Sequence, residues 1–352
     1  MPKPISQCLL GIGTLAIFLF ACAGNASDSA ATVQHDVVFT DYSPLSGNLE
    51  LARRMLSPLN FAQLEREARR KNVKLREQPV DLANERFALY VPAQAPAEGY
   101  ALLVFIAPWQ AAAVPRNWTG ALDRHGMILV TAANSGNTEN VLERRIPLAL
   151  LAAHNVMQRY PVDKERLYIG GLSGGSRVAL RIALAFPDVF HAVLLHSGSD
   201  RVGTAETPLP SAELFKQFQE SMRVVYLTGE NDRVNLDTDV ESRASMQYWC
   251  AYDIDVEPFP FAGHQLAGPR DIDLALGALG GHARPKPDRL ARCRAQREKE
   301  TSEQLQDVSE LLGSGKSQDA LTLLKRIDVR FAGLAAPQSV EFAQKLQVDP
   351  PP

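Results

Sequence analysis

Short apolar runs that alternate with amphipathic segments constrain this chain more than any other feature of its sequence. The run from Ala101 to Pro108, ALLVFIAP, is continuously apolar and has the length of a strand buried on both faces. Further apolar runs lie in residues 127–134, 166–173, 191–199, 223–230 and 253–261, with helix-forming segments between them. This alternation predicts stacked β-α-β units, and therefore an α/β fold with a doubly wound, mostly parallel sheet covered by helices on both faces.

The segments on either side of this pattern differ from it. Residues 1–22 resemble an export signal, and residues 23–79 indicate a linker with a polar tether at 27–35, followed by an N-terminal helical segment. Residues 80–282 carry the α/β pattern. Residues 283–352 predict a helical C-terminal extension with a disordered end. The chain is 45% hydrophobic with a net charge of −3, which provides a sizeable core and no general attraction to nucleic acid.

The N-terminus has the pattern of a leader peptide. Lys3 precedes a mostly apolar run over residues 5–20, which is shorter than the roughly 20 residues that a membrane-spanning helix needs. We therefore predict export to the bacterial periplasm or envelope. The letters LFAC, ending at Cys22, resemble a lipobox, in which Cys22 is lipidated and anchors the protein to a membrane. Cleavage after Ala23 or Ala26 fits the sequence equally well.

Export changes what the cysteines predict. Once the leader is removed, only Cys250 and Cys293 remain, and an oxidising compartment favours a disulfide between them. The bridge would close a loop of about 40 residues and stabilise the fold by roughly 3–4 kcal/mol in the loop-entropy model. Two free buried thiols are the alternative. No other side chain stands at metal-ligand spacing from either cysteine, so we expect no metal site and no cofactor.

The stretch Gly171-Leu172-Ser173-Gly174-Gly175 fits the pattern G-x-S-x-G. It directly follows the strand-like RLYIG and opens the amphipathic segment SRVALRIALAF. A strand that turns sharply into a helix crowds its apex residue, and glycine at Gly171 and Gly175 removes that crowding. The sequence thus predicts a nucleophile elbow with Ser173 exposed above the sheet. The alternative is a glycine-rich turn without chemical function.

A serine nucleophile needs a base, and His264 is the best candidate. It follows the last apolar run, in a loop expected at the carboxyl edge of the sheet, with Gly263 allowing close approach. His196 lies near the same edge and is interpreted as a pocket or structural residue. The remaining histidines are expected at surface or packing positions: His35, His125, His154, His191 and His282.

The base in turn needs a carboxylate that orients it. Asp232 lies a few residues past the run 223–230, and Glu230 lies two residues nearer to that run. Asp237 and Asp239 lie at the start of the next expected helix, where acids favour the helix N-terminus. We prefer Asp232, and the alternative for it is a turn or N-cap residue. The order Ser173, Asp232, His264 is the one expected of this fold.

An acyl-transfer site also needs two N–H groups that stabilise an oxyanion. Gly174, directly after the nucleophile, should provide one of them. Trp109 or Gln110, in the loop after ALLVFIAP, should provide the other, although no HGGG motif occurs there. Trp109 and Trp118 either line the pocket or pack in the core.

One long stretch resembles the α/β-hydrolase fold esterases of the polyhydroxybutyrate-depolymerase and feruloyl-esterase-like group: PVDKERLYIGGLSGGSRVALRIALAFPDVFHAVLLHSGS. More distantly, it resembles the prolyl-oligopeptidase-type hydrolase domains. The matching positions are Val162, Asp163, Arg166 and Tyr168 before the elbow, and Phe186, Pro187, Asp188 and Phe190 after it. The resemblance covers about residues 80–282. It implies a serine esterase in which Ser173, Asp232 and His264 form the triad.

The departures from these families bear on the substrate. The loop after the base is GHQLAGPRD, without the Trp- and Pro-bearing loop of many secreted polymer esterases, and the terminal extension is helical. This favours a small-molecule ester or acylated substrate over a polymer. A peptidase or thioesterase of the same fold, and a non-catalytic envelope binding protein, remain open alternatives. The sequence leaves the oligomeric state undetermined.

Export generates the first testable prediction. Mass spectrometry of the mature protein should show either a diacylated Cys22 as the first residue or an unmodified N-terminus just after Ala23 or Ala26. An exported protein loses its leader in both cases. A mature chain that still begins at Met1 would contradict the prediction.

Overall fold

The computed structural model describes residues 31–346 except residue 75 and residues 282–286. The predicted leader with Cys22, His282 and the predicted disordered end lie outside the described residues. The centre of the molecule is an eight-stranded sheet in the order β1-β2-β4-β3-β5-β6-β7-β8. Its strands are β1 (Thr32–Val37), β2 (Phe87–Val91), β3 (Tyr100–Ile106), β4 (Met127–Ala132), β5 (Val162–Leu172), β6 (Ala192–His196), β7 (Arg223–Leu227) and β8 (Ile254–Val256).

The sheet is mostly parallel, which confirms the fold class predicted from the sequence. Strand β2 runs antiparallel to both β1 and β4, and all pairs from β4–β3 to β7–β8 are parallel. Because parallel strands end at one edge, the loops after β3, β5, β7 and β8 come together there. Ligands of such sheets bind at this carboxyl edge.

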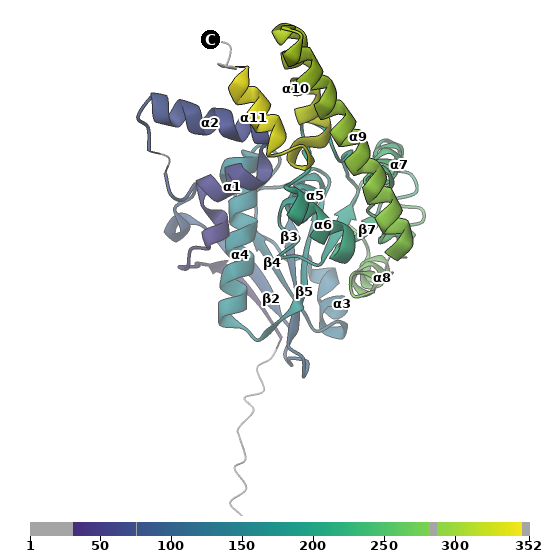
Figure 1. Cartoon of the computed structure of the whole chain (residues 1–352). Helices are drawn as coiled ribbons and strands as arrows, with labels where there is room; N and C mark the ends of the chain where they lie inside the picture. Colours follow the sequence, from purple (N-terminus) through teal and green to yellow (C-terminus); the bar gives the residue numbers. More distant parts are fainter. Residues whose placement is uncertain (1–30, 75, 282–286, 347–352) are drawn as a thin grey trace, which may run out of the picture.

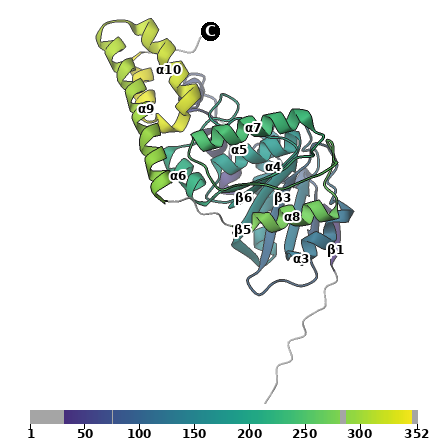
Figure 2. The same cartoon turned by 90° about the vertical axis from the view of Figure 1, so that its right-hand side faces the viewer.

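Helices cover both faces of the sheet (Figures 1 and 2). The helices of the α/β body are α3 (Thr119–Arg124), α4 (Ile146–Arg159), α5 (Gly174–Ala185), α6 (Ala212–Ser221), α7 (Arg233–Tyr248) and α8 (Pro269–Leu279). Short turns are η1 (Pro44–Ser46), η2 (Leu82–Asn84), η3 (Arg116–Trp118), the π-helical η4 (Val141–Arg145) and η5 (Ala332–Leu334). Helices α3 and α8 pack on one face, and α4 and α5 pack on the other.

Strand β3 shows why the sheet needs two covered faces. All seven of its residues are buried, and successive side chains point to opposite faces. Leu102 and Val104 join the core beneath α4 and α5, whereas Leu103 and Phe105 join the core beneath α3 and α8. The continuous apolar run identified in the sequence is therefore explained by burial on both sides.

The N-terminal segment differs from its prediction at one point. Residues 32–37 overlap the predicted polar tether, yet they form β1, which pairs with β2 at the edge of the sheet. The strand TVQHDV is short and largely exposed. It therefore lacks the apolar run that marks the central strands. Its position in the sheet is determined by backbone hydrogen bonds to the open edge of β2. The helical part of this segment is α1 (Asn48–Met55) and α2 (Pro58–Arg70).

The C-terminal extension is helical and consists of α9 (Pro287–Gly313), α10 (Ser317–Phe331) and α11 (Gln338–Lys345). Helices α9 and α10 form a hairpin that projects from the α/β body (Figure 2). The structure joins Cys250, just after α7, to Cys293 in α9 by a disulfide with a Cα–Cα distance of 5.9 Å. In the described part of the chain, no helix is long and apolar enough to cross a membrane.

Candidate active site

Ser173 lies at the tip of the turn between β5 and α5, in a backbone conformation that side chains disfavour. Its φ is 56° and its ψ is −123°. A Cβ on Gly171 would overlap the backbone of Gly175, and a Cβ on Gly175 would overlap the carbonyl oxygen of Ile106. The two glycines of the motif thus allow the strand, the turn and the helix to approach closely, as a nucleophile elbow requires.

Asp232 and His264 are in direct contact. His264 Nδ1 lies 2.7 Å from Asp232 Oδ2, and Asp232 is 8% exposed whereas the imidazole is half-exposed. Asp232 occupies the N-cap position of α7, but its carboxylate makes no capping hydrogen bond to that helix. The carboxylate faces the imidazole instead. A donating Nδ1–H leaves Nε2 unprotonated and free to act as a base.

The other acids weighed from the sequence lie elsewhere. Glu230 is exposed and accepts a hydrogen bond from the Phe261 N–H at 3.2 Å. Asp237 is exposed within α7. Asp239 is buried and accepts hydrogen bonds from Ser199 and Thr228, both at 2.6 Å, while its burial raises the pKa of the carboxyl. Asp232 is the one of the four that contacts His264.

Asn235, which the sequence analysis did not select, stabilises this pair. Its Nδ2 donates to both carboxylate oxygens of Asp232 at 2.9 Å. The same nitrogen lies 3.1 Å from His264 Nδ1, but with Nδ1 protonated both atoms are donors and no hydrogen bond joins them. Arg177 Nη2 lies 3.5 Å from Asn235 Oδ1. A guanidinium group can only donate, so this contact directs the amide oxygen toward Arg177 and the amide nitrogen toward Asp232.

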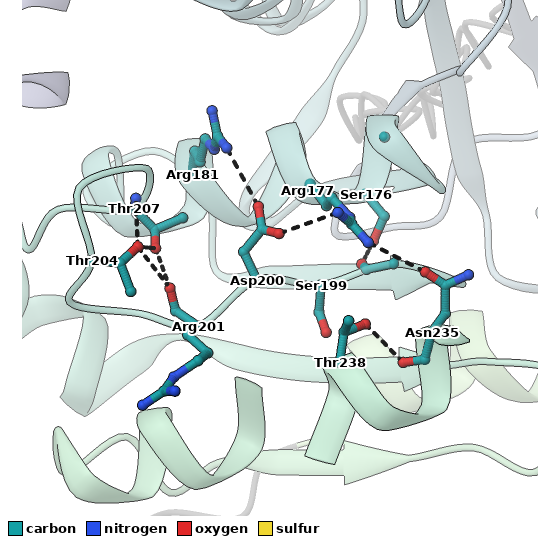
Figure 3. A network of polar contacts seen from close by, with 12 residues as sticks. Ser176, Arg177, Arg181, Ser199, Asp200, Arg201, Thr204, Thr207, Asn235 and Thr238 are labelled. Atoms are coloured by element: carbon teal, nitrogen blue, oxygen red, sulfur yellow. Dashed lines mark hydrogen bonds and ion pairs between the residues drawn. The ribbon is translucent and has the colours of Figure 1, made fainter. Parts of the chain in front are cut away.

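Arg177 also connects this pair to the elbow. Figure 3 shows Arg177 between Asp200 and Asn235, and Arg181 on the far side of Asp200. The Arg177 N–H is 3.3 Å from the Ser173 carbonyl oxygen, so the contacts run from Ser173 through the first turn of α5 to Asn235. In the described part of the chain, Ser173 and His264 make no direct hydrogen bond; in unliganded sites this contact is often long.

His196 holds the loop that carries His264. It is completely buried at the end of β6, with Nδ1 2.9 Å from the Leu227 carbonyl oxygen and Nε2 3.0 Å from the Ala267 N–H. This pattern fixes the neutral form with a proton on Nδ1. Trp118 is also fully buried, and its Nε1–H donates to the Ala267 carbonyl oxygen at 3.0 Å. Both backbone groups of Ala267 are therefore held in place.

The remaining described histidines lie away from this contact. His35 is exposed on β1, His154 lies on α4, His191 precedes β6, and His125 Nε2 contacts Asp273 at 3.0 Å. Residues 31–346, outside the undescribed stretches, hold no group of three or more His, Cys, Asp or Glu side chains arranged for a metal ion.

The sequence predicted that Gly263 allows a close approach of the His264 loop, and this prediction is wrong. A Cβ at Gly263 would meet no atom within 4 Å, so this position does not require glycine for close approach. The glycine that does is Gly229, after β7, where a Cβ would overlap the carbonyl oxygens of Ala262 and Gly263. The loop before Asp232 and the loop before His264 touch at Gly229, which brings the two side chains together.

The candidate oxyanion donors lie on two neighbouring loops. Gly174 is the first residue of α5, so its N–H has no acceptor within the helix. Neither the Trp109 nor the Gln110 N–H donates a hydrogen bond to a described residue. The Gln110 carbonyl oxygen accepts from the Asn134 N–H at 2.6 Å, which fixes this loop against the loop after β4. The arrangement leaves N–H groups available next to Ser173.

Comparison with known proteins identifies a family that the central part of the chain resembles. Residues 132–237 match the family model described as esterase, PHB depolymerase, over less than a third of the chain. The match includes Ser173 and Asp232 and confirms the resemblance to polyhydroxybutyrate-depolymerase-like esterases. The chain is an esterase-like hydrolase with the α/β-hydrolase fold. No protein of a curated collection matches the sequence.

Solved structures with similar folds are distant in sequence. An S-formylglutathione hydrolase from Staphylococcus aureus is 13% identical, with a TM-score of 0.46 over 55% of this chain and 92% of its own. A ferulic acid esterase is 16% identical, with a TM-score of 0.41 over 55% and 89%. An acetyl xylan esterase from Aspergillus awamori is 13% identical, with a TM-score of 0.41 over 55% and 94%.

The burial of His196 generates a prediction about stability. Complete burial lowers the pKa of His196 from 6.5 to about 4. The unfolded chain therefore binds a proton near pH 6.5 that the folded protein binds only near pH 4. The contribution of His196 to the free energy of unfolding is fully present above pH 6.5 and is lost as the pH drops toward 4. This one group lowers the free energy of unfolding by at most about 1.4 kcal/mol per pH unit.

The measurement is urea unfolding at pH 7, 6 and 5 for the wild type and His196→Gln. The variant should be less stable at pH 7, because it loses the contact to Ala267, but its stability should depend less on pH. Parallel losses of stability in both proteins would show that His196 is not the group responsible. Both proteins need the same m-value for the comparison to hold.

Proposed function

We propose that the protein is an exported serine hydrolase that cleaves a carboxylic ester through an acyl-enzyme on Ser173. The observation that carries this proposal is the contact of 2.7 Å between His264 Nδ1 and the buried Asp232, beside a strained serine at a strand-to-helix turn. Export rests on the leader sequence.

The proposed reaction begins with His264 Nε2 taking the proton of Ser173 Oγ as this oxygen attacks the ester carbonyl carbon. The carbonyl π electrons move to its oxygen, which the Gly174 N–H and an N–H of Trp109 or Gln110 stabilise. Asp232 stabilises the imidazolium through Nδ1–H. When the tetrahedral intermediate collapses, the C–O bond to the alcohol breaks and His264 gives the proton to the departing alkoxide.

The second half of the reaction repeats these steps with water. His264 takes a proton from water as the water oxygen attacks the acyl carbon, and the carboxylic acid leaves when Ser173 Oγ recovers the proton. No redox step occurs, and the chain's own residues supply every proton transfer. The family match over residues 132–237 supports an ester as the bond that is cleaved.

Two exposed apolar side chains support a substrate with an apolar part. Phe261, three residues before His264, is 89% exposed, and Val234, two residues after Asp232, is 72% exposed. Val234 lies in the first turn of α7. The loop before this helix touches the loop of Phe261, because the Asn231 N–H donates to the Ala262 carbonyl oxygen at 2.8 Å. We propose a small ester with an apolar acyl or alcohol group, which such side chains contact at low desolvation cost.

The first test is labelling of the purified mature protein with a fluorophosphonate, which forms an O–P bond to an activated serine and releases fluoride. Ser173→Ala and His264→Ala should abolish labelling, and Ser173→Ala should lower the hydrolysis of p-nitrophenyl butyrate by at least about 10³-fold. His35→Ala, which changes an exposed histidine on β1, serves as the matched control and should label normally. Undiminished hydrolysis by pure Ser173→Ala would refute the proposal.

The second test concerns Asn235 as a positioning residue. Asn235→Ala removes a donor to both carboxylate oxygens of Asp232, so kcat should fall by a part of the roughly 10²–10⁴-fold that general-base catalysis contributes. Asn235→Asp places a second carboxylate beside the imidazole and favours its protonated, inactive form. The acidic limb of the kcat/KM profile should therefore move to higher pH. A purely structural role would lower stability and leave the position of this limb unchanged.

A further inference from the structure

Arg145 is a buried cation behind the candidate oxyanion site. It ends the π-helical turn before α4 and is only 3% exposed. Its Nε donates to the Ser135 carbonyl oxygen at 2.9 Å, its Nη2 lies 3.3 Å from the Ala107 carbonyl oxygen, and its Nη1 lies 3.4 Å from the Gly174 carbonyl oxygen. Among the described residues, no carboxylate lies within ion-pair distance of it, although the charge of Glu139 favours its protonated form, and burial lowers the pKa of Arg145 to about 10. A buried charge that no carboxylate contacts directly is costly, and packing alone does not require one.

The three carbonyl groups belong to the three segments that build the oxyanion site. Ala107 directly follows β3 and leads into the loop of Trp109 and Gln110. Gly174 provides the N–H next to the nucleophile. Ser135 lies in the loop after β4, which fixes Gln110 through the Asn134 N–H. One guanidinium therefore sets the relative positions of all three segments.

Asn137 lies between the candidate donors. It is exposed, and a Cβ placed on Gly174 would overlap its side chain. Its backbone N–H donates to the Pro108 carbonyl oxygen at 3.0 Å. Asn137 therefore contacts both the nucleophile elbow and the loop of Trp109 and Gln110, at the boundary with solvent.

The orientation of the Asn137 amide follows from Arg145. Arg145 Nη2 lies 3.4 Å from Asn137 Oδ1. Because a guanidinium only donates hydrogen bonds, the amide oxygen faces Arg145 and the Nδ2 amine faces away from it. A Cβ placed on Gly174 would overlap Asn137 Oδ1 and lie 3.1 Å from Nδ2, so both atoms of the amide lie beside Gly174. Within the described part of the chain the amine makes no hydrogen bond, so its hydrogens are free to bind a ligand.

We propose that Asn137 Nδ2 is a side-chain donor of the oxyanion hole, and that Arg145 is the positioning residue that holds it together with the backbone donors. This inference rests on the proposed function. As the Ser173 Oγ–C bond forms, the electron pair of the carbonyl moves to its oxygen, and Asn137 Nδ2 donates a hydrogen bond to that oxygen. The bond strengthens as the negative charge develops, so it favours the transition state over the bound substrate.

Asn137→Ala is the decisive variant. Loss of one oxyanion donor lowers kcat by about 10²–10³-fold, and KM should change little because the substrate carbonyl is weakly charged. We expect this loss with p-nitrophenyl butyrate, and a parallel loss in the rate of fluorophosphonate labelling, because the phosphonyl oxygen occupies the same position. The midpoint of thermal unfolding should stay unchanged, since Asn137 is exposed.

Glu143→Gln is the matched control. It removes the charge of an exposed side chain in the same connection between β4 and α4, two residues before Arg145, and keeps its size. This variant should retain the wild-type kcat. A loss equal to that of Asn137→Ala would assign the effect to the loop as a whole and overturn the role of Asn137.

Arg145 is tested by Arg145→Lys alone and combined with Asn137→Ala. Lysine keeps the charge but loses the fork that reaches three segments. If Arg145 acts through Asn137, the double variant loses less in kcat than the product of the two single losses. Fully multiplicative losses would overturn the positioning role, and should Arg145→Lys not fold, Asn137→Ala decides the proposal by itself.

The outcomes separate this inference from the proposed function. A wild-type protein that neither hydrolyses the ester nor labels at Ser173 would overturn both. An active wild type together with an Asn137→Ala variant that retains more than a third of its kcat would overturn the inference and leave the proposed function standing. Loss of kcat at constant KM and constant thermal stability supports the inference.

Discussion

Ser173 occupies a backbone region (φ 56°, ψ −123°) that costs a residue with a side chain about 1–3 kcal/mol, so its surroundings have to compensate. They do so through close backbone packing. Gly171 and Gly175 touch each other and Ile106, and a Cβ on Gly198, after β6, would come within 2.6 Å of the Ser173 carbonyl oxygen. Three strands therefore approach the turn closely enough to hold it in a conformation it would not keep alone.

Buried neutral groups hold the loops that carry His264 and Asp232. His196 and Trp118 bind the two backbone groups of Ala267, and Asn235 donates to both oxygens of Asp232. A hydrogen bond in a low-dielectric interior is strong, and an unsatisfied partner there is costly. The loop of His264 consequently has few alternative positions, although the imidazole itself is half-exposed.

The sequence predicted those parts of the molecule that depend on local patterns. The buried strands, the elbow around Ser173 and the preference for Asp232 over Glu230 all follow from residue type and from distance to a strand end. Strand β1 escaped prediction because an exposed edge strand has no apolar run. The close approach attributed to Gly263 belongs to Gly229, because contact between two loops depends on tertiary structure.

The sequence did not predict the roles of Asn137, Arg145 and Asn235 for a related reason. Each is an ordinary polar residue within a helix or a loop, and its importance arises from partners on segments far along the chain. Arg145 directly follows Arg144 at the start of an apolar helical pattern, where charged residues suggest a solvent-exposed position, yet it is buried among carbonyl groups of three segments. A pattern in sequence reports which elements form, whereas the groups that these elements bring together depend on how they pack.

The C-terminal extension is joined to the helix that carries Asn235. Cys250, just past the end of α7, is bonded to Cys293 in α9, and Tyr248, the last residue of α7, binds Glu300 of α9 at 2.6 Å. The opposite end of α7 carries Asn235 and begins directly after Asp232. Sixteen helical residues span about 24 Å, so these contacts lie at the far end of the helix from the contact between Asp232 and His264. The extension therefore constrains the end of α7 that lies away from the reacting groups, whereas the hydrogen bonds of Asn235 constrain the end beside them.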